Sequence, residues 1–330
     1  MLLGSATSVA LDVSERLRGW LPFAQRRRAW LAALFLILFP LVAPFKALAT
    51  MILIYGLYAL GFNILFGYLG LLSFGHSALF GTGAYFCGIA IAHFGLPWWA
   101  ALSLGVLGGV LAAAAIGVLA IRTLGIYFAM VTLALSQCLY YLFYQATDWT
   151  GGENGLTGVN VKTINLFGFG LDFVNPLVHY YVIAAFVIVA LFALSRILAS
   201  PFGAVIEGVR ESEARARASG IDVVRVRFVT FVVSGAFCGL AGALLALHLS
   251  IVPIETMHYD TSGLAVMMCL LGGMGTFFGP FVGAAIFLLL ENLVSLYTVH
   301  WQLIVGAAFI ACVLFFPRGV WGTILQRSRT

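Results

Sequence analysis

Long apolar segments with almost no charge restrict how this chain can fold more than any other feature. Charged residues make up 9% of its 330 residues, against roughly 25% in an ordinary soluble domain. So few charges cannot cover a water-exposed surface, and the chain is too hydrophobic to be disordered. A bilayer-spanning helix needs about 20 apolar residues, and the 62% apolar content supplies roughly ten of them. The sequence therefore predicts an all-α polytopic membrane protein.

Ten apolar stretches follow one another between a leader, residues 1–28, and a tail, residues 318–330. Residues 29–317 form a single transmembrane domain in this interpretation. We interpret the first stretch as a retained helix, because its leader is too long for a signal peptide. Nine helices, with a re-entrant segment near 67–76, are the alternative. The approximate bounds of the ten are 29–45, 47–66, 76–94, 97–122, 125–145, 180–199, 228–250, 262–271, 280–298 and 301–316.

The positions of the charges indicate how the chain is oriented. Ten crossings with the amino terminus inside place both termini and the loop at 200–227 in the cytoplasm. Six arginines lie between Arg196 and Arg227, whereas the loop at 147–179, placed outside, has three acids and one lysine. This distribution follows the positive-inside rule. It explains the net charge of +5 without nucleic-acid binding.

Five stretches precede the long outer loop and five follow it. An odd number in each half makes equivalent helices cross in opposite directions, as in the inverted repeats of transporters. Glycine-rich breaks near Gly67 and Gly272 interrupt the helices in both halves. In such folds the substrate binds near the membrane midplane, between the repeats.

Polar residues inside apolar stretches are the candidates for the substrate path. Glu291 is the clearest, because intramembrane charge is costly and usually functional; the alternative is an outer helix end that reaches water. Backbone N–H groups at a helix start near a glycine-rich break could hold a carboxylate, or polar side chains there could simply satisfy the broken backbone. Lone polar residues on apolar helices could instead bond between helices. The candidates are Asn63, Ser73, His76, Gln137, Glu291 and Asn292.

The loop at 200–227 contains more than a turn requires. Ser200 and Pro201 predict a helix start, with a capping hydroxyl and proline at the first position. Apolar residues then recur at helical spacing, and Gly220 is placed to end a charged, alanine-rich segment. The segment is either a docking helix for a cytoplasmic partner, which we favour, or a helix on the membrane surface. The candidate contacts are Glu207, Arg210, Glu211, Glu213, Arg217 and Gly220.

Nothing in the sequence predicts catalysis. There is no phosphate-binding loop, since the only lysines are Lys46 and Lys162, and the five cysteines lack metal-ligand spacing. We therefore expect a protein that is not an enzyme and binds no metal or cofactor. If ATP drives its function, the ATPase is another chain.

Seven segments, in order along the chain, resemble the LivM-type permease subunit of the branched-chain amino acid ABC importer family. They are NILFGYLGLLSFGH (63–76), RTLGIYFAMVTLA (122–134), TGGENGLTG (150–158), SPFG (200–203), RESE (210–213), ASGI (218–221) and LGGMGTFFGP (271–280).

The resemblance implies an ABC importer permease fold in the bacterial inner membrane. It implies a heterodimer with a LivH-type permease, two cytoplasmic ATPase subunits that bind ATP and Mg, and a periplasmic solute-binding protein. The loop at 200–221 would then couple the permease to an ATPase. Family members also belong to importers of urea, amides and aromatic acids, so these solutes remain alternative substrates. A secondary transporter and a passive small-solute channel are the alternatives from other classes.

Overall fold

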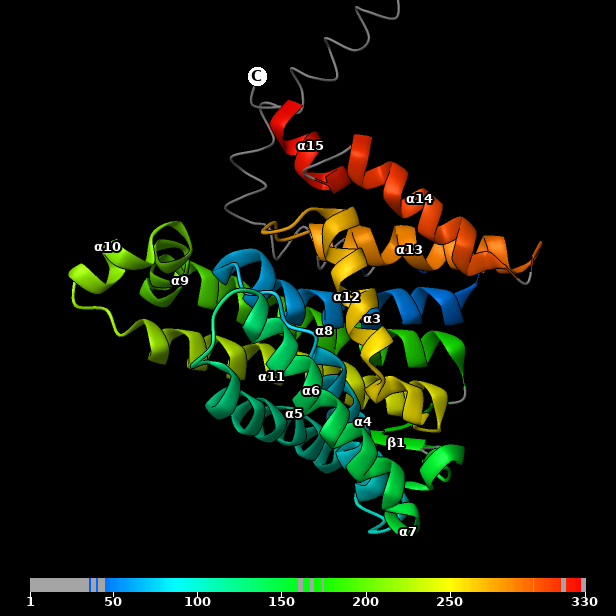
Figure 1. The fold of residues 1–330 in the computed structure, drawn as a ribbon. Coiled ribbons are helices and arrows are strands. Elements are labelled where there is room, and N and C mark those ends of the chain that lie inside the picture. Colours follow the sequence, from blue (N-terminus) through cyan, green and yellow to red (C-terminus); the bar gives the residue numbers. More distant parts are fainter. Residues whose placement is uncertain are drawn as a thin grey trace, which may run out of the picture.

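The computed structural model describes residues 36, 40, 45–159, 163–166, 169–173, 175–298, 300–315 and 319–327 (Figure 1). The expected leader, most of the apolar stretch at 29–45, and residues 328–330 of the expected tail lie outside the described residues. Each apolar stretch predicted from 47–66 onward corresponds to a helix. The membrane-type helices are α3 (Lys46–Asn63), α4 (His76–Ala92), α5 (Trp98–Ala120), α6 (Ile126–Gln145), α8 (Pro176–Ala199), α11 (Val223–Leu249), α12 (Tyr259–Gly272), α13 (Gly279–Ser295) and α14 (Trp301–Phe315).

Five helical segments in the described residues are long and apolar enough to cross a membrane. They are Lys46–Leu69, Trp98–Ala120, Ile126–Gln145, Pro176–Ala199 and Val223–Leu249. Helices α4, α13 and the apolar part of α14 are shorter. The chain is thus a helical protein with several membrane-type helices, as its low charge predicts.

Helix α3 does not stop at a simple turn. It continues into a π-helix, η1 (Ile64–Leu69), which ends at Gly70 in the left-handed conformation, with φ of 83°. Residues 70–75 then link η1 to α4 without regular structure, and Ser73 and Gly75 within this link are buried. Non-helical backbone at membrane depth is tolerated only where protein covers it or where it lines a cavity. Burial of this link within the bundle satisfies that condition.

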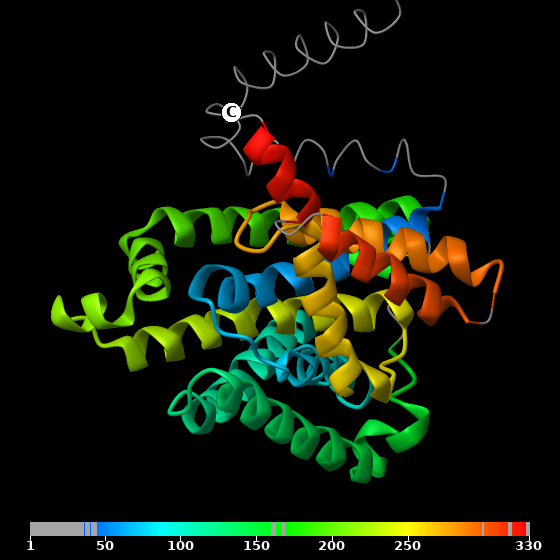
Figure 2. The same cartoon turned by 45° about the horizontal axis from the view of Figure 1, so that its top comes forward.

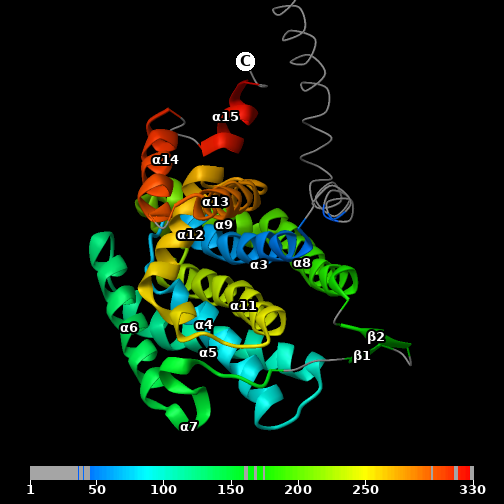
Figure 3. The same ribbon diagram turned by 90° about the vertical axis from the view of Figure 1, so that its right-hand side faces the viewer.

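Helix α11 is the centre of the bundle. It packs against α4 and α5 on one side and α3 on the other (Figure 3). Glycines make the approach to α5 possible: a Cβ on Gly239 would lie 2.8 Å from the Cα of Gly109 and 2.9 Å from the carbonyl oxygen of Gly105. Small residues at such faces let helix backbones come close and gain van der Waals contact.

The packing of the two ends of the chain is reciprocal. Helix α11, from the later part, lies against the α4–α5 pair, and α3, from the earlier part, lies against the α12–α13 pair. Helices α12 and α13 also approach closely, since a Cβ on Gly283 would lie 2.8 Å from the backbone nitrogen of Gly272. Each part of the chain therefore contributes one helix that packs against a helix pair of the other part.

A small structure of short helices and a β-hairpin occupies the expected loop at 147–179. It consists of α7 (Thr147–Thr150), the 3₁₀ helix η2 (Gly152–Asn154) and an antiparallel hairpin, β1 (Thr163–Leu166) with β2 (Phe169–Asp172). An isolated bridge between Leu156 and Val252 ties this loop to the segment after α11, next to the 3₁₀ helix η3 (Ile254–Met257). The expectation of an all-α chain therefore holds for the bundle but not for this loop.

The loop expected at 200–227 ends earlier, because α11 already begins at Val223. The rest of it folds into two helices, α9 (Pro201–Glu211) and α10 (Glu213–Ala218), at the opposite end of the bundle from the β-hairpin (Figures 1 and 2). We call this pair the α9–α10 hairpin. The helix start at Pro201 is confirmed, but the predicted cap is wrong, because the Ser200 hydroxyl donates backwards to the Ile197 carbonyl (2.6 Å). Ser212, in an extended conformation, separates the helices, and its side chain caps α10.

The predicted helix end at Gly220 is confirmed. Its φ is 81°, and the Ile221 N–H donates to the Ala216 carbonyl at 3.1 Å. This is the hydrogen-bond pattern with which a left-handed glycine ends a helix. Beyond α14, part of the expected tail forms α15 (Gly319–Arg327).

Gly239→Ala tests the close contact of α11 and α5. The added methyl would meet backbone on two sides, where no flexible side chain can move, so we expect a loss of about 1–3 kcal/mol in the free energy of unfolding. Gly263→Ala on α12 is the matched control, because nothing lies within 4 Å of its Cβ position. Unfolding in mixed micelles measures both; equal stability of the two variants would contradict the packing described.

Candidate transport path and coupling site

Asn63 lies at the junction of α3 and the π-helix and is fully buried. Its Nδ2 donates to the Thr276 carbonyl and its Oδ1 accepts from the Gly275 N–H, both at 3.0 Å. The side-chain amide thus joins one glycine-rich break, at the end of α3, to the other, in the link between α12 and α13. Since both ends of the amide bond to backbone, the geometry is that of a bond between helices.

His76 begins α4 and is also fully buried. Its Nε2 lies 2.9 Å from the Ser234 hydroxyl, which itself donates to the Gly61 carbonyl at 2.6 Å. Because the only proton of Ser234 is used in that bond, we assign the proton of the imidazole to Nε2. Nδ1 is buried without a partner among the described residues, and the rings of Phe62 and Phe231 meet the imidazole edge-on.

Backbone N–H groups around the start of α4 are already bonded within the protein. Three of them donate to hydroxyl groups of the chain itself: Phe74 to Thr132 (3.2 Å), Gly75 to Ser73 (3.2 Å) and Ser77 to Ser262 (2.8 Å). The Ser262 hydroxyl also donates back to the Phe74 carbonyl (2.8 Å). In this conformation the hydroxyls satisfy the broken backbone, and a substrate carboxylate would have to displace them.

Glu291 and Asn292 lie in a different part of the bundle. They line a cavity of about 310 Å³ between α3, α12 and α13, together with Met51, Tyr55 and Met268. Glu291 is half-buried and Asn292 is exposed. The other described residues of the cavity wall are largely aliphatic and aromatic, and Glu291 is the acidic one among them. Such a cavity suits a small solute with an apolar body and a cationic or hydrogen-bond-donating group.

Gln137 stands apart from both groups. It lies on α6, half-buried, and its Nε2 is buried without a hydrogen-bond partner in the described part of the chain. The neighbouring Ser136 hydroxyl lies 3.1 Å from that of Ser77 on α4. The structure therefore places Ser73 and His76 in and next to the link at 70–75 and Asn63 between the two breaks, whereas Glu291 and Asn292 line a separate cavity.

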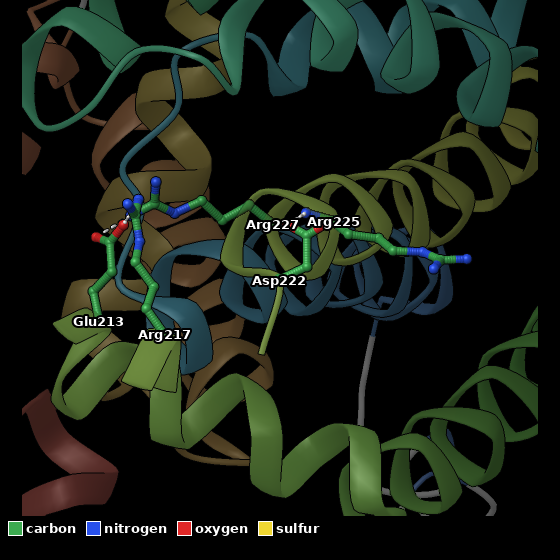
Figure 4. Close-up of polar contacts among 5 residues, drawn as sticks. All are labelled: Glu213, Arg217, Asp222, Arg225 and Arg227. Atoms are coloured by element: carbon green, nitrogen blue, oxygen red, sulfur yellow. Dashed lines mark hydrogen bonds and ion pairs between the residues drawn. The ribbon is translucent and has the colours of Figure 1, made fainter. Parts of the chain in front are cut away.

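Glu213 holds the α9–α10 hairpin to the bundle. Its carboxylate accepts from Arg217 and from Arg227, each at 2.6 Å, so it stands between one arginine on its own helix and one on α11 (Figure 4). The Arg227 side chain is only 8% exposed, whereas that of Glu213 is 30% exposed. Arg225, on the same turn of α11, points away from this group in Figure 4.

The remaining candidate coupling residues are all exposed, but they differ in their contacts. Nη1 of Arg210 donates to the Gly67 carbonyl. Among the described residues, Glu207, Glu211 and Gly220 have no bond to the bundle, and Glu211 has a loose ion pair with Arg215, at 3.7 Å, within the hairpin itself. Glu207 and Glu211 are thus acids that a partner could reach.

Sequence analysis missed four residues that the site depends on: Thr132, Arg227, Ser234 and Ser262. Serines and threonines in membrane helices often bond to their own backbone, so their presence alone marks no site. A sequence signal existed only for Arg227, since an arginine inside the first turns of an apolar helix needs an acid nearby.

The fold and these sites define a polytopic membrane protein with buried polar links between its helices and a charged hairpin at one end. The profile of the family described as branched-chain amino acid transport system / permease component matches residues 45–314. The chain belongs to this family of permeases.

Curated relatives agree with the family. The chain is 28% identical over 292 residues to the high-affinity branched-chain amino acid transport system permease protein LivM of Salmonella typhimurium, covering 83% of this chain and 69% of the relative. LivM of Escherichia coli gives 28% over 295 residues, with the same coverage. A probable LivH of Methanocaldococcus jannaschii is 30% identical over 169 residues, 48% of this chain and 50% of that protein. No solved structure matches the chain.

Glu213→Gln tests the anchor of the hairpin. It leaves the guanidinium of Arg227 buried without a charged partner, which we expect to cost about 1–3 kcal/mol because Glu213 is partly solvated. Trypsin cleavage within 210–217 should then be at least about fivefold faster. Glu211→Gln is the control, since its exposed pair is worth under about 1 kcal/mol. Equal cleavage rates for the two variants would show that Glu213 anchors nothing.

Proposed function

We propose that this chain is the transmembrane permease subunit of an ATP-driven ABC importer that carries branched-chain amino acids or a related small solute by alternating access. The family match over residues 45–314 carries the proposal, because it includes the membrane helices, both glycine-rich breaks and the α9–α10 hairpin. The names of the relatives support the substrate class, since the LivM proteins are named for branched-chain amino acid transport.

The proposed architecture has ten transmembrane helices in two inverted halves of five. The reciprocal packing of α3 with α12–α13 and of α11 with α4–α5 supports it, as does the presence of one break in each half. The first crossing is assigned to the apolar stretch at 29–45. An inverted repeat places the two breaks near a common axis, and the Asn63 bonds that join them agree with this arrangement.

The proposed orientation puts the α9–α10 hairpin and both termini in the cytoplasm of a bacterial cell, with the chain in the inner membrane. The arginines of the hairpin region and the acids of the loop at 147–179 follow the positive-inside rule in this orientation. The hairpin and the β1–β2 loop lie at opposite ends of the bundle, as the proposal requires (Figure 1).

The proposed assembly pairs this chain with a LivH-type permease, two cytoplasmic ATPase subunits and a periplasmic solute-binding protein. The resemblance to a LivH protein over about half the chain supports a pair of permeases of related fold. ATP and Mg bind to the ATPase subunits, and this chain binds no cofactor. The exposed hairpin acids Glu207 and Glu211 are assigned to the ATPase contact, and the Glu291 cavity to the substrate path.

Reconstitution tests the function directly. The chain, co-expressed with the permease and ATPase subunits encoded beside it, is placed in proteoliposomes with the solute-binding protein. Uptake of a radiolabelled branched-chain amino acid should require ATP on the side of the membrane where the ATPase subunits lie. Uptake without ATP, or by this chain alone, would contradict an ABC importer and favour a channel or secondary transporter.

Charge reversal tests the docking surface. We expect Glu207→Lys with Glu211→Lys to lower the amount of ATPase that co-purifies with the chain at least about fivefold, because like charges across an interface repel. Neither acid bonds to the bundle within the described residues, so membrane insertion should be normal. Glu153→Lys, an exposed acid at the opposite end, is the control. Unchanged co-purification would place the ATPase contact elsewhere.

Glu291→Gln tests the path. If the carboxylate holds a cationic group of the substrate, its loss should raise the substrate concentration for half-maximal uptake about tenfold, which corresponds to roughly 1.4 kcal/mol. Ser295→Ala in the same cavity removes a hydroxyl that already bonds to the Asn292 carbonyl, and it should change little. Normal uptake by the Glu291 variant would assign this residue to a helix end that reaches water.

A further inference from the structure

Three segments far apart in the sequence meet at Arg210, in the last turn of α9. Its Nη1 donates to the Gly67 carbonyl of the π-helix. Its aliphatic stem covers Gly70, where a Cβ would lie 3.3 Å from the Cγ of Arg210. The same Nη1 lies 3.1 Å from the position that a Cβ would take on Gly275. One side chain of the hairpin thus contacts both glycine-rich breaks.

Glycine is required on the receiving side of this contact. Gly70 and Gly275 have φ of 83° and 73°, which side chains disfavour. Gly67 is packed so closely that a Cβ there would collide with the side-chain oxygen of Asn63. Because these three positions carry no side chain, Arg210 lies directly beside backbone there, and the Gly67 carbonyl accepts from its guanidinium.

The side chain of Asn63 connects the two breaks directly. Its amide bonds to Gly275 and Thr276 on one side, while its backbone leads directly into the π-helix on the other. A π-turn interrupts the regular ladder of an α-helix and is frequent at functional sites. A displacement of the Gly67 carbonyl would consequently reach the α12–α13 link through a single side chain.

The hairpin has a second, independent attachment. Glu213 ties α10 to Arg227 of α11, and Ser212, in an extended conformation, separates this attachment from Arg210 on α9. Helix α9 also packs against α8, α11 and η1, with Ile206 and Val209 buried. In the described part of the chain, the polar contact between α9 and the glycine-rich breaks is the bond from Arg210 to the Gly67 carbonyl.

We propose that Arg210 is a positioning residue that transmits movement of the α9–α10 hairpin to both glycine-rich breaks together. The proposal rests on the proposed function, since the ATPases supply the movement. In it, Arg210 is turned toward the permease and is not an ATPase contact. Loss of its side chain should leave the ATPases bound and active, but their movement should no longer displace the two glycine-rich breaks.

The first experiment measures coupling in the reconstituted transporter. Arg210→Gln should bind the ATPases normally but move at least fivefold less substrate per ATP hydrolysed. Arg210→Lys should keep more than half of the wild-type ratio, because an ammonium can still donate to the Gly67 carbonyl. Arg225→Gln is the control, since it removes an exposed arginine that points away from Glu213 and Arg227 (Figure 4). An unchanged ratio in Arg210→Gln overturns the proposal, and so does loss of ATPase binding as large as in the Glu207/Glu211 double variant.

The second experiment needs neither ATP nor partner chains, so its outcome is separate from that of the proposed function. Met274→Cys places a thiol in the α12–α13 link at a site that is 41% exposed, after the accessible Cys138 and Cys312 are replaced by serine. Maleimide labelling of the purified chain should be at least threefold faster with Arg210→Gln and unchanged with Arg225→Gln. Equal labelling rates overturn the proposal, even if the transporter proves to be ATP-driven.

Discussion

The structure depends on one requirement: backbone groups that leave the helical ladder inside a membrane must find partners within the protein. In the described residues, two such places lie at 70–75 and 273–278, next to the glycine-rich breaks. The amide of Asn63, the hydroxyls of Ser262 and Thr132, and the guanidinium of Arg210 satisfy the freed groups. Each of these side chains comes from a segment remote in sequence. At the breaks, hydrogen bonds consequently join parts of the chain that are distant in sequence.

Close contact between helices brings the donors and acceptors of these hydrogen bonds within bonding distance. Glycines on α5 and α11 bring the two backbones together, and glycines on α12 and α13 do the same in the later part of the chain. In lipid there is little hydrophobic drive between helices, so packing at small residues and hydrogen bonds between helices supply the association. Larger side chains at these positions would hold the helices apart and leave the polar links unmade.

The helices were predictable from the sequence, because long uncharged stretches have few alternatives to a membrane helix. The helix start at Pro201 and the terminator at Gly220 were also predictable, since proline and glycine act through local backbone geometry. The break at Ser212 and the π-helix were not, because both depend on tertiary contacts. Among the site residues, Asn63 stood out as a lone polar group, but its partners lie more than 200 residues away. The inward direction of Arg210 could not be read from a charged, alanine-rich segment.

The bonds of Asn63 also bear on how the protein is made. Its partners, Gly275 and Thr276, lie 212 and 213 residues later in the chain. Chains emerge from the ribosome at about 5–20 residues per second, so the end of α3 waits at least about ten seconds for the groups that complete it. During synthesis the early helices must therefore be inserted with unmet polar groups, and membrane chaperones or proteases have that interval in which to act on them.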